Sequence, residues 1–350
     1  MQIALFVPAP WETVSGGYVY DRAMVEGLRR AGHAVQVVAL PGSHPLPDAA
    51  AIVAAEQGWH ALSPDTVPLI DGLCLPAFGG LRSTSLWARA VGLIHHPTAL
   101  ETGRSDATRE ALRATEAALL PTLGHIVVTS ADTAQRVVAD FGARAQCVSV
   151  VEPGTPMLPR SEGPLASGPC TILTVATLIP RKGHDVLMRA LARLTDLDWR
   201  LVIAGGAPDA AYAQTLHALA AELHIAEKVR FAGTCTPAEL EPLWAEAAVY
   251  ASATQYEGYG MAIAEALRRG LPIAVTAGGA AAALVTPECS VVCPPGDQDG
   301  LSRAIRRLIF DRPLRLAMAE AAWRVGRALP DWPEQAARLE TVLAQVLEEH

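Results

Sequence analysis

The sequence predicts an α/β protein made of two domains, each built around a parallel β-sheet. Segments typical of strands and of helices alternate along the whole chain, as they do in doubly wound parallel sheets. A stretch rich in Pro, Gly and Ser, without periodicity, divides this alternation into two series. The 350 residues, 51% of them hydrophobic, also suffice for two sheets buried on both faces. We therefore expect Rossmann-like domains at residues 1–152 and 170–330, joined by a linker at 153–169.

The first domain is expected to contain six strands, each predicted by a short apolar run. Their positions are 2–7, 34–39, 66–70, 91–94, 125–129 and 147–151. Longer amphipathic runs predict helices, for example at 18–31 and 105–119. Residues 41–65 carry no clear pattern, so we expect a loop there.

The second domain repeats the alternation. Strands are expected near 170–175, 199–204, 229–231, 247–252, 272–275 and 290–293. Helices are expected near 183–194, 209–223, 237–246, 260–269, 298–310 and 313–325. A final helix, at about 334–348 within residues 331–350, has one apolar stripe made of Leu339, Val342, Leu343, Val346 and Leu347.

The charge of the chain argues against nucleic acid as a partner. The formal net charge is −8, and no basic run is interleaved with aromatic residues. Residues 1–151 hold 10 Arg, no Lys and 13 Asp or Glu residues, which gives this half a formal charge of −3. It therefore shows no strong signal for binding an anionic membrane, which a basic amphipathic face would provide.

The cysteines and the apolar runs favour a cytoplasmic location. The six cysteines contain no C-x-x-C pair, which argues against a zinc site and a disulfide framework. No apolar run approaches the roughly 18 residues that cross a bilayer. Met1 leads directly into a strand, without the charged segment or cleavage site of a signal peptide.

The segment from Glu257 to Glu265 is the strongest candidate for a binding site. It leaves an apolar strand, passes through Gly258-Tyr259-Gly260 and enters an Ala-rich helix. The glycines let the backbone approach a ligand, and the free N–H groups of the helix start favour an anion. The second carboxylate lies roughly 7 Å further along, so both can face a nucleoside-diphosphate sugar. For either Glu alone, a helix-dipole partner or a surface residue is the simpler interpretation.

Two other loops offer groups that suit a phosphate. Gly16 and Gly17 follow the first strand and open a helix, although a glycine pair there is more often a simple turn. Arg181 and Lys182 follow the strand at 170–175. Lys182 is one of only two lysines in the chain, and the Arg fork matches phosphate oxygens. A solvated charge at a helix start remains the alternative for Arg181.

A histidine pair ends the strand at 91–94, at the edge where open α/β sheets bind ligands. Neighbouring His95 and His96 point to opposite sides, so we expect at most one of them to be catalytic. Asp71 closes the preceding strand at the same edge, and Glu101 follows a few residues after the histidines.

Taken in order, these motifs resemble those of the retaining family 4 glycosyltransferases, which have the GT-B architecture. The strongest match is Glu-Gly-Tyr-Gly at 257–260, followed by Glu-Ala and by Gly-Leu-Pro at 270–272. The resemblance implies that two Rossmann-like, doubly wound parallel-sheet domains face an inter-domain cleft. The N-terminal domain then binds the acceptor and the C-terminal domain the nucleotide-sugar donor. It also implies that the last helix packs back on the first domain; packing within the second is the alternative.

The same resemblance implies a role for each matched residue. Cations and glycine amides stabilise the donor diphosphate, Glu257 orients the sugar, Glu265 binds the ribose hydroxyls, and a histidine polarises the sugar or acceptor. The expected catalytic residues are His95, Arg181, Lys182 and Glu257. The expected donor-binding residues are Gly16, Gly17, Gly258, Tyr259, Gly260 and Glu265. The expected acceptor-binding residues are Asp71 and Glu101.

The sequence departs from the family pattern at two places. Thr177 stands where many relatives carry Arg, and we expect Arg181 to supply the missing charge. Four alanines at 280–283 follow the glycine pair after which an acidic residue is common. Asp297 resembles a family Asp but is more simply a helix N-cap.

These expectations describe a retaining hexosyltransferase that needs neither a metal ion nor another cofactor. Its donor is a UDP- or GDP-linked sugar, and a small soluble acceptor is favoured over a lipid. Base and acceptor selectivity are assigned to loops such as 41–65 and 232–236. The alternatives are a GT-B enzyme of another class, such as a nucleotide-sugar epimerase or a phosphorylase, and a catalytically silent sugar-nucleotide binding protein.

Overall fold

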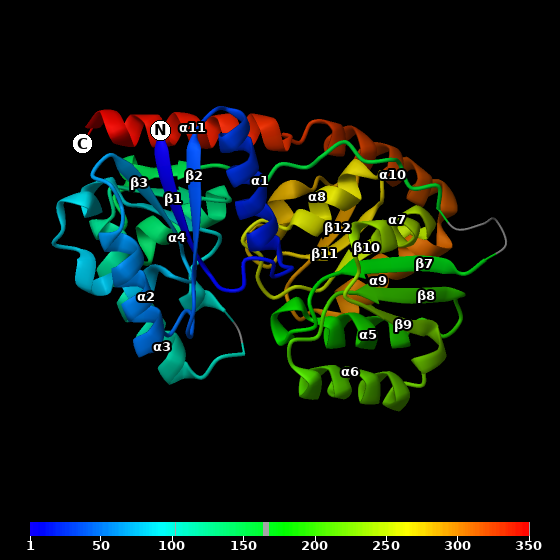
Figure 1. Ribbon diagram of the computed structural model, residues 1–350. Coiled ribbons are helices and arrows are strands. Elements are labelled where there is room, and N and C mark those ends of the chain that lie inside the picture. Colours follow the sequence, from blue (N-terminus) through cyan, green and yellow to red (C-terminus); the bar gives the residue numbers. More distant parts are fainter. Residues whose placement is uncertain (102, 164–167, 350) are drawn as a thin grey trace. The chain divides into compact units, whose positions relative to one another are not determined.

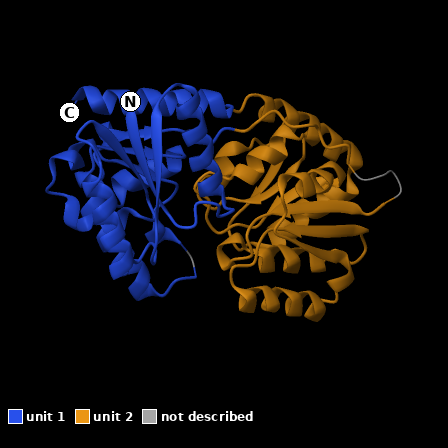
Figure 2. Cartoon of the chain, viewed as in Figure 1, with its two compact units in different colours: residues 1–154, 330–350 blue, residues 155–329 orange. Residues whose placement is uncertain are grey.

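The computed structural model describes residues 1–101, 103–163 and 168–349. The chain divides into two compact units (Figure 2). Unit 1 comprises residues 1–154 and 330–350, and unit 2 comprises residues 155–329. Part of the expected linker at 153–169, residues 164–167, lies outside the described residues.

Unit 1 is built on a six-stranded sheet in which every described pairing is parallel, with the strand order β2-β1-β3-β4-β5-β6 (Figure 1). Apolar side chains form a core on each face of this sheet. The strands are β1 (Gln2–Pro8), β2 (Ala34–Leu40), β3 (Thr66–Asp71), β4 (Val91–Ile94), β5 (His125–Val128) and β6 (Val148–Val150). One face carries α1 (Gly16–Arg30) and α11 (Trp332–Glu349), and the other α2 (Ala49–His60), α3 (Asp106–Leu119) and α4 (Ala131–Ala139).

Unit 2 repeats this plan with a parallel sheet of order β12-β11-β10-β7-β8-β9. Its strands are β7 (Cys170–Val175), β8 (Trp199–Ala204), β9 (Val229–Gly233), β10 (Val249–Ser252), β11 (Ile273–Thr276) and β12 (Ser290–Cys293). One core gathers α5 (His184–Ala192), α6 (Ala210–Glu222) and α9 (Gln298–Phe310). The other gathers α7 (Pro237–Glu246), α8 (Met261–Arg268) and α10 (Arg312–Arg327).

The expected α/β fold class is therefore confirmed, and the strands lie close to their predicted positions. The loop expected at residues 41–65 is wrong, because α2 occupies most of it. Asp48 caps α2 by accepting a hydrogen bond from the Ala51 N–H at 2.9 Å. The helix contains five alanines, which favour a helix without marking one face as apolar. Because of these alanines, the sequence of α2 shows only a weak amphipathic pattern, and the helix was not predicted.

Each sheet reverses its strand order once, and this reversal positions the candidate site. In unit 1 the order reverses between β1 and β3, and in unit 2 between β7 and β10. Loops that leave neighbouring parallel strands on either side of such a reversal run in opposite directions and leave a crevice at the carboxyl ends. The motifs at 16–17, 71, 95, 181–182 and 257 all follow strands at or next to these reversals.

Helix α11 packs on α1 within unit 1. The two backbones are close, since a Cβ on Gly27 would lie 2.2 Å from the Cβ of Ala336. Leu339 and Leu343 are fully buried against the sheet, and His33 Nε2 lies 2.8 Å from Glu340 Oε1. Among the described residues, no helix combines the length and the apolar composition needed to span a membrane.

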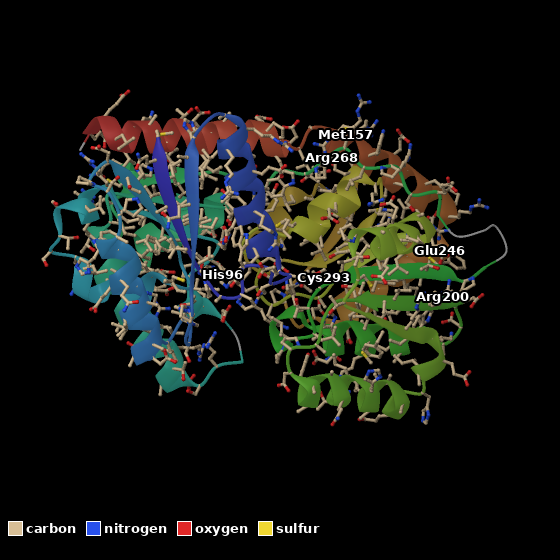
Figure 3. All side chains as sticks on the ribbon, viewed as in Figure 1. His96, Met157, Arg200, Glu246, Arg268 and Cys293 are labelled. Atoms are coloured by element: carbon tan, nitrogen blue, oxygen red, sulfur yellow. The ribbon has the colours of Figure 1, made fainter. Side chains whose placement is uncertain are left out.

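The start of unit 2 is anchored by a buried arginine. Arg268 and Met157, labelled in Figure 3, contact each other through Nη1 and Sδ at 3.1 Å. Arg268 Nη2 also donates to the Leu329 carbonyl at 2.6 Å. The Arg268 guanidinium thus contacts both the first residues of unit 2, at Met157, and its last residue, Leu329.

We predict that Leu343→Ala destabilises unit 1 by about 2–5 kcal/mol, because the truncated side chain leaves a cavity in a closed core. The matched control is Leu316→Ala on α10, where the leucine is 58% exposed and the cost should stay within about 0.5 kcal/mol. Hydrogen exchange followed by mass spectrometry measures the effect on each segment. Faster exchange in α1 and β1 with unchanged exchange in β7 and β8 is expected, and the reverse pattern would contradict this packing.

Candidate functional site

The charged cluster of unit 2 consists of Arg181, Lys182 and Glu257. Lys182 Nζ lies 2.5 Å from Glu257 Oε1, and Arg181 Nη1 lies 3.8 Å from Glu257 Oε2. Arg181 Nη1 also donates to the Tyr256 carbonyl at 2.5 Å. All three side chains are largely buried, with 13–17% of their surface exposed. The structure therefore brings Glu257 to the neighbours Arg181 and Lys182, although 75 positions separate Lys182 from Glu257 in the sequence.

The turn that carries the two cations is pressed against the end of β10. The Gln255 N–H donates to the Arg181 carbonyl at 2.7 Å. Gly183 follows with a φ of 65°, and a Cβ there would lie 2.0 Å from the Ala253 carbonyl oxygen. Only glycine satisfies both constraints, so Gly183 allows the Arg181-Lys182 turn to reach Glu257.

The cluster carries an excess of one positive charge. Burial raises the pKa of Glu257, but Lys182 and Arg181 outweigh this effect and hold it below its usual range. Burial lowers the pKa of Lys182, and Arg181 adds to that effect, while Glu257 opposes it. One carboxylate between two cations leaves a net charge of about +1 in a largely buried place, which suits an anionic ligand.

The glycine turn between β10 and α8 forms beside this cluster. Gly258 and Tyr259 are buried, and Gly260 precedes α8 with a φ of 107°. Gly279 packs on the same segment, since a Cβ there would lie 2.3 Å from the Glu257 carbonyl oxygen. The alanines after Gly279 form a short 3₁₀ turn, Ala280–Leu284, whose side chains offer no charge to a ligand.

Glu265 belongs to a different set of charges. It lies one turn into α8, and the nearby Arg269 forms two hydrogen bonds to Glu241, at 2.8 and 2.6 Å. Burial raises the pKa of Glu265 despite the opposing charge of Arg269. A half-buried carboxylate in this state gains from hydroxyl donors on a ligand.

In unit 1 the structure brings together His95, Asp71 and Gly17. His95 Nε2 lies 3.3 Å from Asp71 Oδ2 and 3.1 Å from Asp21 Oδ1. A Cβ on Gly17 would lie 3.2 Å from the His95 ring, so the start of α1 rests against the imidazole. Gly16 opens α1 and is exposed, with its N–H among the first four of the helix. Asp71 thus lies against His95, and a role toward an acceptor stays a prediction.

Sequence reasoning missed Asp21, although a signal was present. Asp21 follows Gly17 by four residues, which places it one helical turn further on the same side of α1. It interrupts the buried stripe formed by Tyr20, Met24, Val25 and Leu28 and is itself only 2% exposed. A carboxylate on the buried face of a helix indicates that a polar or charged group from another element pairs with it.

His96 and Glu101 form a separate group. His96, labelled in Figure 3, places Nε2 3.1 Å from Glu101 Oε1. Arg104 donates twice to Glu101 Oε2, at 2.8 and 3.0 Å. Burial acts to raise the pKa of Glu101, but His96 and Arg104 lower it to about 2. The two histidines therefore have different partners.

The carboxylates and imidazole of Asp21, Asp71 and His95 also have the spacing of a metal site. Their ligand atoms lie within 4.8 Å of one another, and no other such group occurs among the described residues. His95 Nε2 already forms a hydrogen bond to Asp21 and an ion pair with Asp71, so one N–H faces both carboxylates.

Comparison with known proteins identifies the family. Residues 160–325 match the family model described as glycosyl transferases group 1. Residues 160–325 belong to this family. The resemblance found in the motifs is thereby confirmed.

Two curated relatives and one solved structure describe the similarity of this group 1 protein. The chain is 30% identical over 256 residues to a D-inositol 3-phosphate glycosyltransferase of Corynebacterium aurimucosum, covering 68% of this chain and 61% of that relative. It is 31% identical over 183 residues to a GDP-mannose-dependent alpha-(1-6)-phosphatidylinositol monomannoside mannosyltransferase of Mycolicibacterium smegmatis, covering 49% and 47%. The structure of Anabaena HepE in complex with UDP-glucose superposes with a TM-score of 0.80 at 18% identity, covering both chains fully. That match confirms the GT-B fold.

The departures of this group 1 protein from the family pattern have structural counterparts. The backbone carbonyl of Thr177 accepts a hydrogen bond from His184 Nε2 at 3.1 Å. Arg181 shares Glu257 with Lys182, and its replacement of the charge missing at 177 stays a prediction. Asp297 caps α9 by accepting from the Gly300 N–H at 2.8 Å, as the simpler interpretation predicted.

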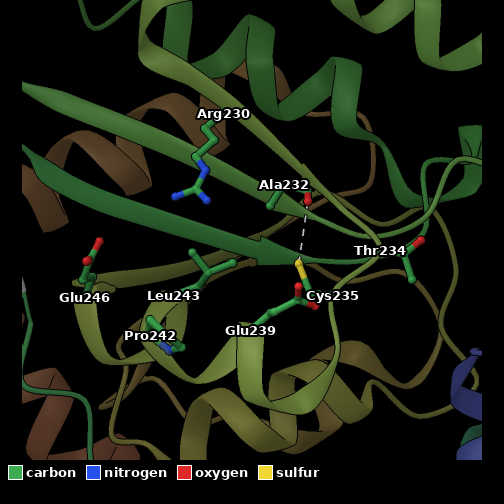
Figure 4. A pocket seen from close by; sticks show the side chains of 8 residues that line it. All are labelled: Arg230, Ala232, Thr234, Cys235, Glu239, Pro242, Leu243 and Glu246. Atoms are coloured by element: carbon green, nitrogen blue, oxygen red, sulfur yellow. Dashed lines mark hydrogen bonds between the residues drawn. The ribbon is translucent and has the colours of Figure 1, made fainter.

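The segment at 232–236 borders a shallow pocket of about 340 Å³ in unit 2 (Figure 4). Glu239 is held at its rim, because its carboxylate accepts from the N–H and hydroxyl of Thr236, each at 2.8 Å. A role of this segment in base selectivity stays a prediction. The lining residues are Arg230, Ala232, Thr234, Cys235, Glu239, Pro242, Leu243 and Glu246.

Glu116, also missed from the sequence, holds the turn that follows the histidine pair. Its carboxylate accepts from the Thr98 N–H at 2.6 Å, the Thr98 hydroxyl at 2.9 Å and the Ala99 N–H at 3.2 Å. The residue is only 5% exposed, and burial raises its pKa above the ordinary value although these hydrogen bonds oppose the shift.

We predict that Glu116→Ala loosens the turn at 98–100 without unfolding unit 1. Each buried donor left without a partner costs about 1–3 kcal/mol, so the Thr98 and Ala99 amides should exchange roughly 10- to 100-fold faster. Glu110→Ala on the same helix is the matched control, since Glu110 is exposed. Unchanged amide exchange at Thr98 in Glu116→Ala would show that the turn does not depend on this carboxylate.

Proposed function

We propose that this protein is a retaining glycosyltransferase that moves a hexosyl group from a nucleoside-diphosphate sugar to a hydroxyl or similar nucleophile. The observation that carries the proposal is the cluster of Arg181, Lys182 and Glu257 at the strand-order reversal of unit 2. Family membership and the names of the relatives, which transfer glycosyl groups, support it.

The two cations stabilise the leaving group. As the glycosidic bond breaks, negative charge grows on the diphosphate, and preorganised cations near that charge lower the barrier. Glu257 holds both cations before the donor arrives, so their geometry is set in advance. The amides at Gly16 and Gly17 add donors at a helix start. In this proposal these groups take the place of a divalent ion.

The two glutamates bind opposite ends of the donor. Glu257 orients the transferred sugar, and Glu265, whose pKa is raised by burial, accepts hydrogen bonds from the ribose hydroxyls. The donor is a UDP- or GDP-linked sugar. The UDP-glucose of HepE and the GDP-mannose dependence of the mycobacterial relative are consistent with either base.

Transfer proceeds with retention by a front-face route, in which the leaving phosphate takes the acceptor proton. We assign the acceptor to unit 1, with Glu101 as a candidate residue for binding it and His95 as the residue that polarises the sugar or acceptor. A small soluble acceptor is favoured because residues 1–151 are acidic and contain no lysine. The inositol phosphate in the name of the corynebacterial relative is an acceptor of that kind.

We predict that Lys182→Ala lowers kcat/KM by roughly 10²–10³, the effect of losing one preorganised charge-stabilising donor. The only other lysine provides the control. Lys228 donates to the Leu197 carbonyl at 3.3 Å and lies over the Trp199 ring, so Lys228→Ala should stay within about threefold of wild type.

The transfer assay should be run in excess EDTA. Its donor should be the nucleotide sugar that raises the melting temperature of the protein most. Turnover is expected to persist, because the proposal uses no metal. Activity that is lost in EDTA and restored by Mg²⁺ or Mn²⁺ would refute the assigned electrostatics. A Lys182→Ala variant with unchanged kinetics would remove this lysine from the site.

We also predict opposite effects of the two glutamates on binding of the bare nucleoside diphosphate. Glu265→Ala should weaken it about 10- to 100-fold, through lost hydrogen bonds worth about 1.5–3 kcal/mol each. Glu257→Gln should preserve or tighten it, because Lys182 and Arg181 lose a competing carboxylate, while sugar transfer falls. Calorimetric titration measures both. Weaker binding in Glu257→Gln alone would mean that the roles are reversed.

A further inference from the structure

Two buried carboxylates, those of Asp21 and Asp71, contact His95, and one imidazolium can balance the charge of only one of them. Asp21 on α1 and Asp71 at the end of β3 are 2% and 3% exposed, and both point an oxygen at the same ring nitrogen. Asp71 is fixed in this orientation, because its other oxygen accepts from the Leu73 N–H at 2.8 Å. The Thr129 hydroxyl holds the histidine backbone by donating to the His95 carbonyl at 2.9 Å.

This geometry decides which ring nitrogen carries a proton. Nε2 lies between two carboxylate oxygens, at 3.1 and 3.3 Å, so a lone pair at Nε2 would face two acceptors. Among the described residues, every hydrogen bond and ion pair to this ring ends at Nε2. The Nε2 edge of the ring also packs against Gly17. Nδ1 is the nitrogen left to contact a ligand.

The charge balance favours a second proton on the ring. A neutral imidazole would leave two buried carboxylates with no counter-charge at their shared contact, whereas an imidazolium reduces the group to a net charge of −1. Burial lowers the pKa of His95, but the charge of Asp21 and the hydrogen bonds to both carboxylates raise it to about 10.

The other groups facing this cluster do not replace the imidazolium. On the β3 side, burial and the two aspartates raise the pKa of the Cys74 thiol, which keeps it neutral. On α1, burial raises the pKa of Tyr20, whose hydroxyl donates to the Val151 carbonyl, and raises that of Tyr18 to about 12. The Arg22 guanidinium, next to Asp21 in the chain, donates to the carbonyls of Trp11 and Thr13.

We propose that Asp21 and Asp71 are positioning residues that keep His95 an imidazolium, so that His95 acts as a hydrogen-bond donor through Nδ1 and never as the base. The role in transfer rests on the proposed function. When the bond from the anomeric carbon to the diphosphate oxygen breaks and the bond to the acceptor oxygen forms, the acceptor proton goes to the leaving phosphate oxygen. The net negative cluster meanwhile suits the positive charge that develops on the sugar.

The protonation state is measured directly by NMR titration of the full chain labelled at histidine, with His95→Gln to assign the signal. The His95 ring is expected to stay an imidazolium from pH 6 to beyond pH 8, whereas an ordinary histidine, with a pKa of about 6.5, loses its charge over this range. Because the folded-state pKa is raised, the charged ring adds stability below about pH 6.5 that is lost as the pH rises toward 10.

The positioning role is tested by Asp21→Asn, which keeps the side-chain shape and removes one charge. The midpoint of the His95 titration should fall by at least one pH unit in Asp21→Asn. Asp71→Asn should lower the midpoint too, and it replaces the first variant if Asp21→Asn does not fold. Glu26→Gln on the same helix is the control, because Glu26 is exposed and pairs with Arg30. That variant should leave the titration unchanged.

Two results would overturn the proposal. One is a His95 ring that is neutral at pH 7.5 in the wild-type chain. The other is a metal ion bound one to one in the purified protein, whose removal by EDTA changes the His95 signals. Neither readout depends on turnover. Failure of every nucleotide sugar to be consumed would instead count against the proposed function and leave the titration interpretable.

Discussion

Each six-stranded sheet reverses its strand order once, and the candidate residues leave the sheets at or next to that reversal. Parallel strands end at one edge, so the loops after neighbouring strands are close in space although the helices between them separate their sequences widely. In unit 2 this brings the loop after β7 to the loop after β10. In unit 1 it brings the start of α1 to the ends of β3 and β4. The strand order therefore decides which charged side chains can meet, and the individual contacts then form between them.

The two units use buried charge with opposite sign. In unit 2 one carboxylate lies between two cations and leaves a positive excess, which suits a diphosphate. In unit 1 one imidazole lies between two carboxylates and leaves a negative excess. In both clusters the charges compensate one another incompletely, which is common where a protein binds a charged ligand.

Glycine sets how closely these groups approach. A side chain at Gly183 would strike the Ala253 carbonyl and push the Arg181-Lys182 turn away from β10, and one at Gly279 would strike the Glu257 carbonyl. At Gly17 the margin is smaller, since a Cβ would lie 3.2 Å from the His95 ring. Gly17, which looks like a phosphate-binding position in the sequence, therefore also acts as a spacer for a charged side chain, as Gly183 and Gly279 do.

The sequence by itself determined the two-unit α/β fold, the strand positions and most of the helices, because apolar periodicity and turn residues are local properties of the chain. The motif residues were also found locally, as groups at strand ends. Helix α2 was missed because its alanines give no marked face, and Glu116 because a carboxylate in an amphipathic helix looks like a surface charge. Only the tertiary structure decided the pairing of Lys182 with Glu257 and of His95 with Asp21, across 75 and 74 residues. Protonation and net charge at each cluster follow from burial and from these distant partners, and a local sequence pattern carries neither.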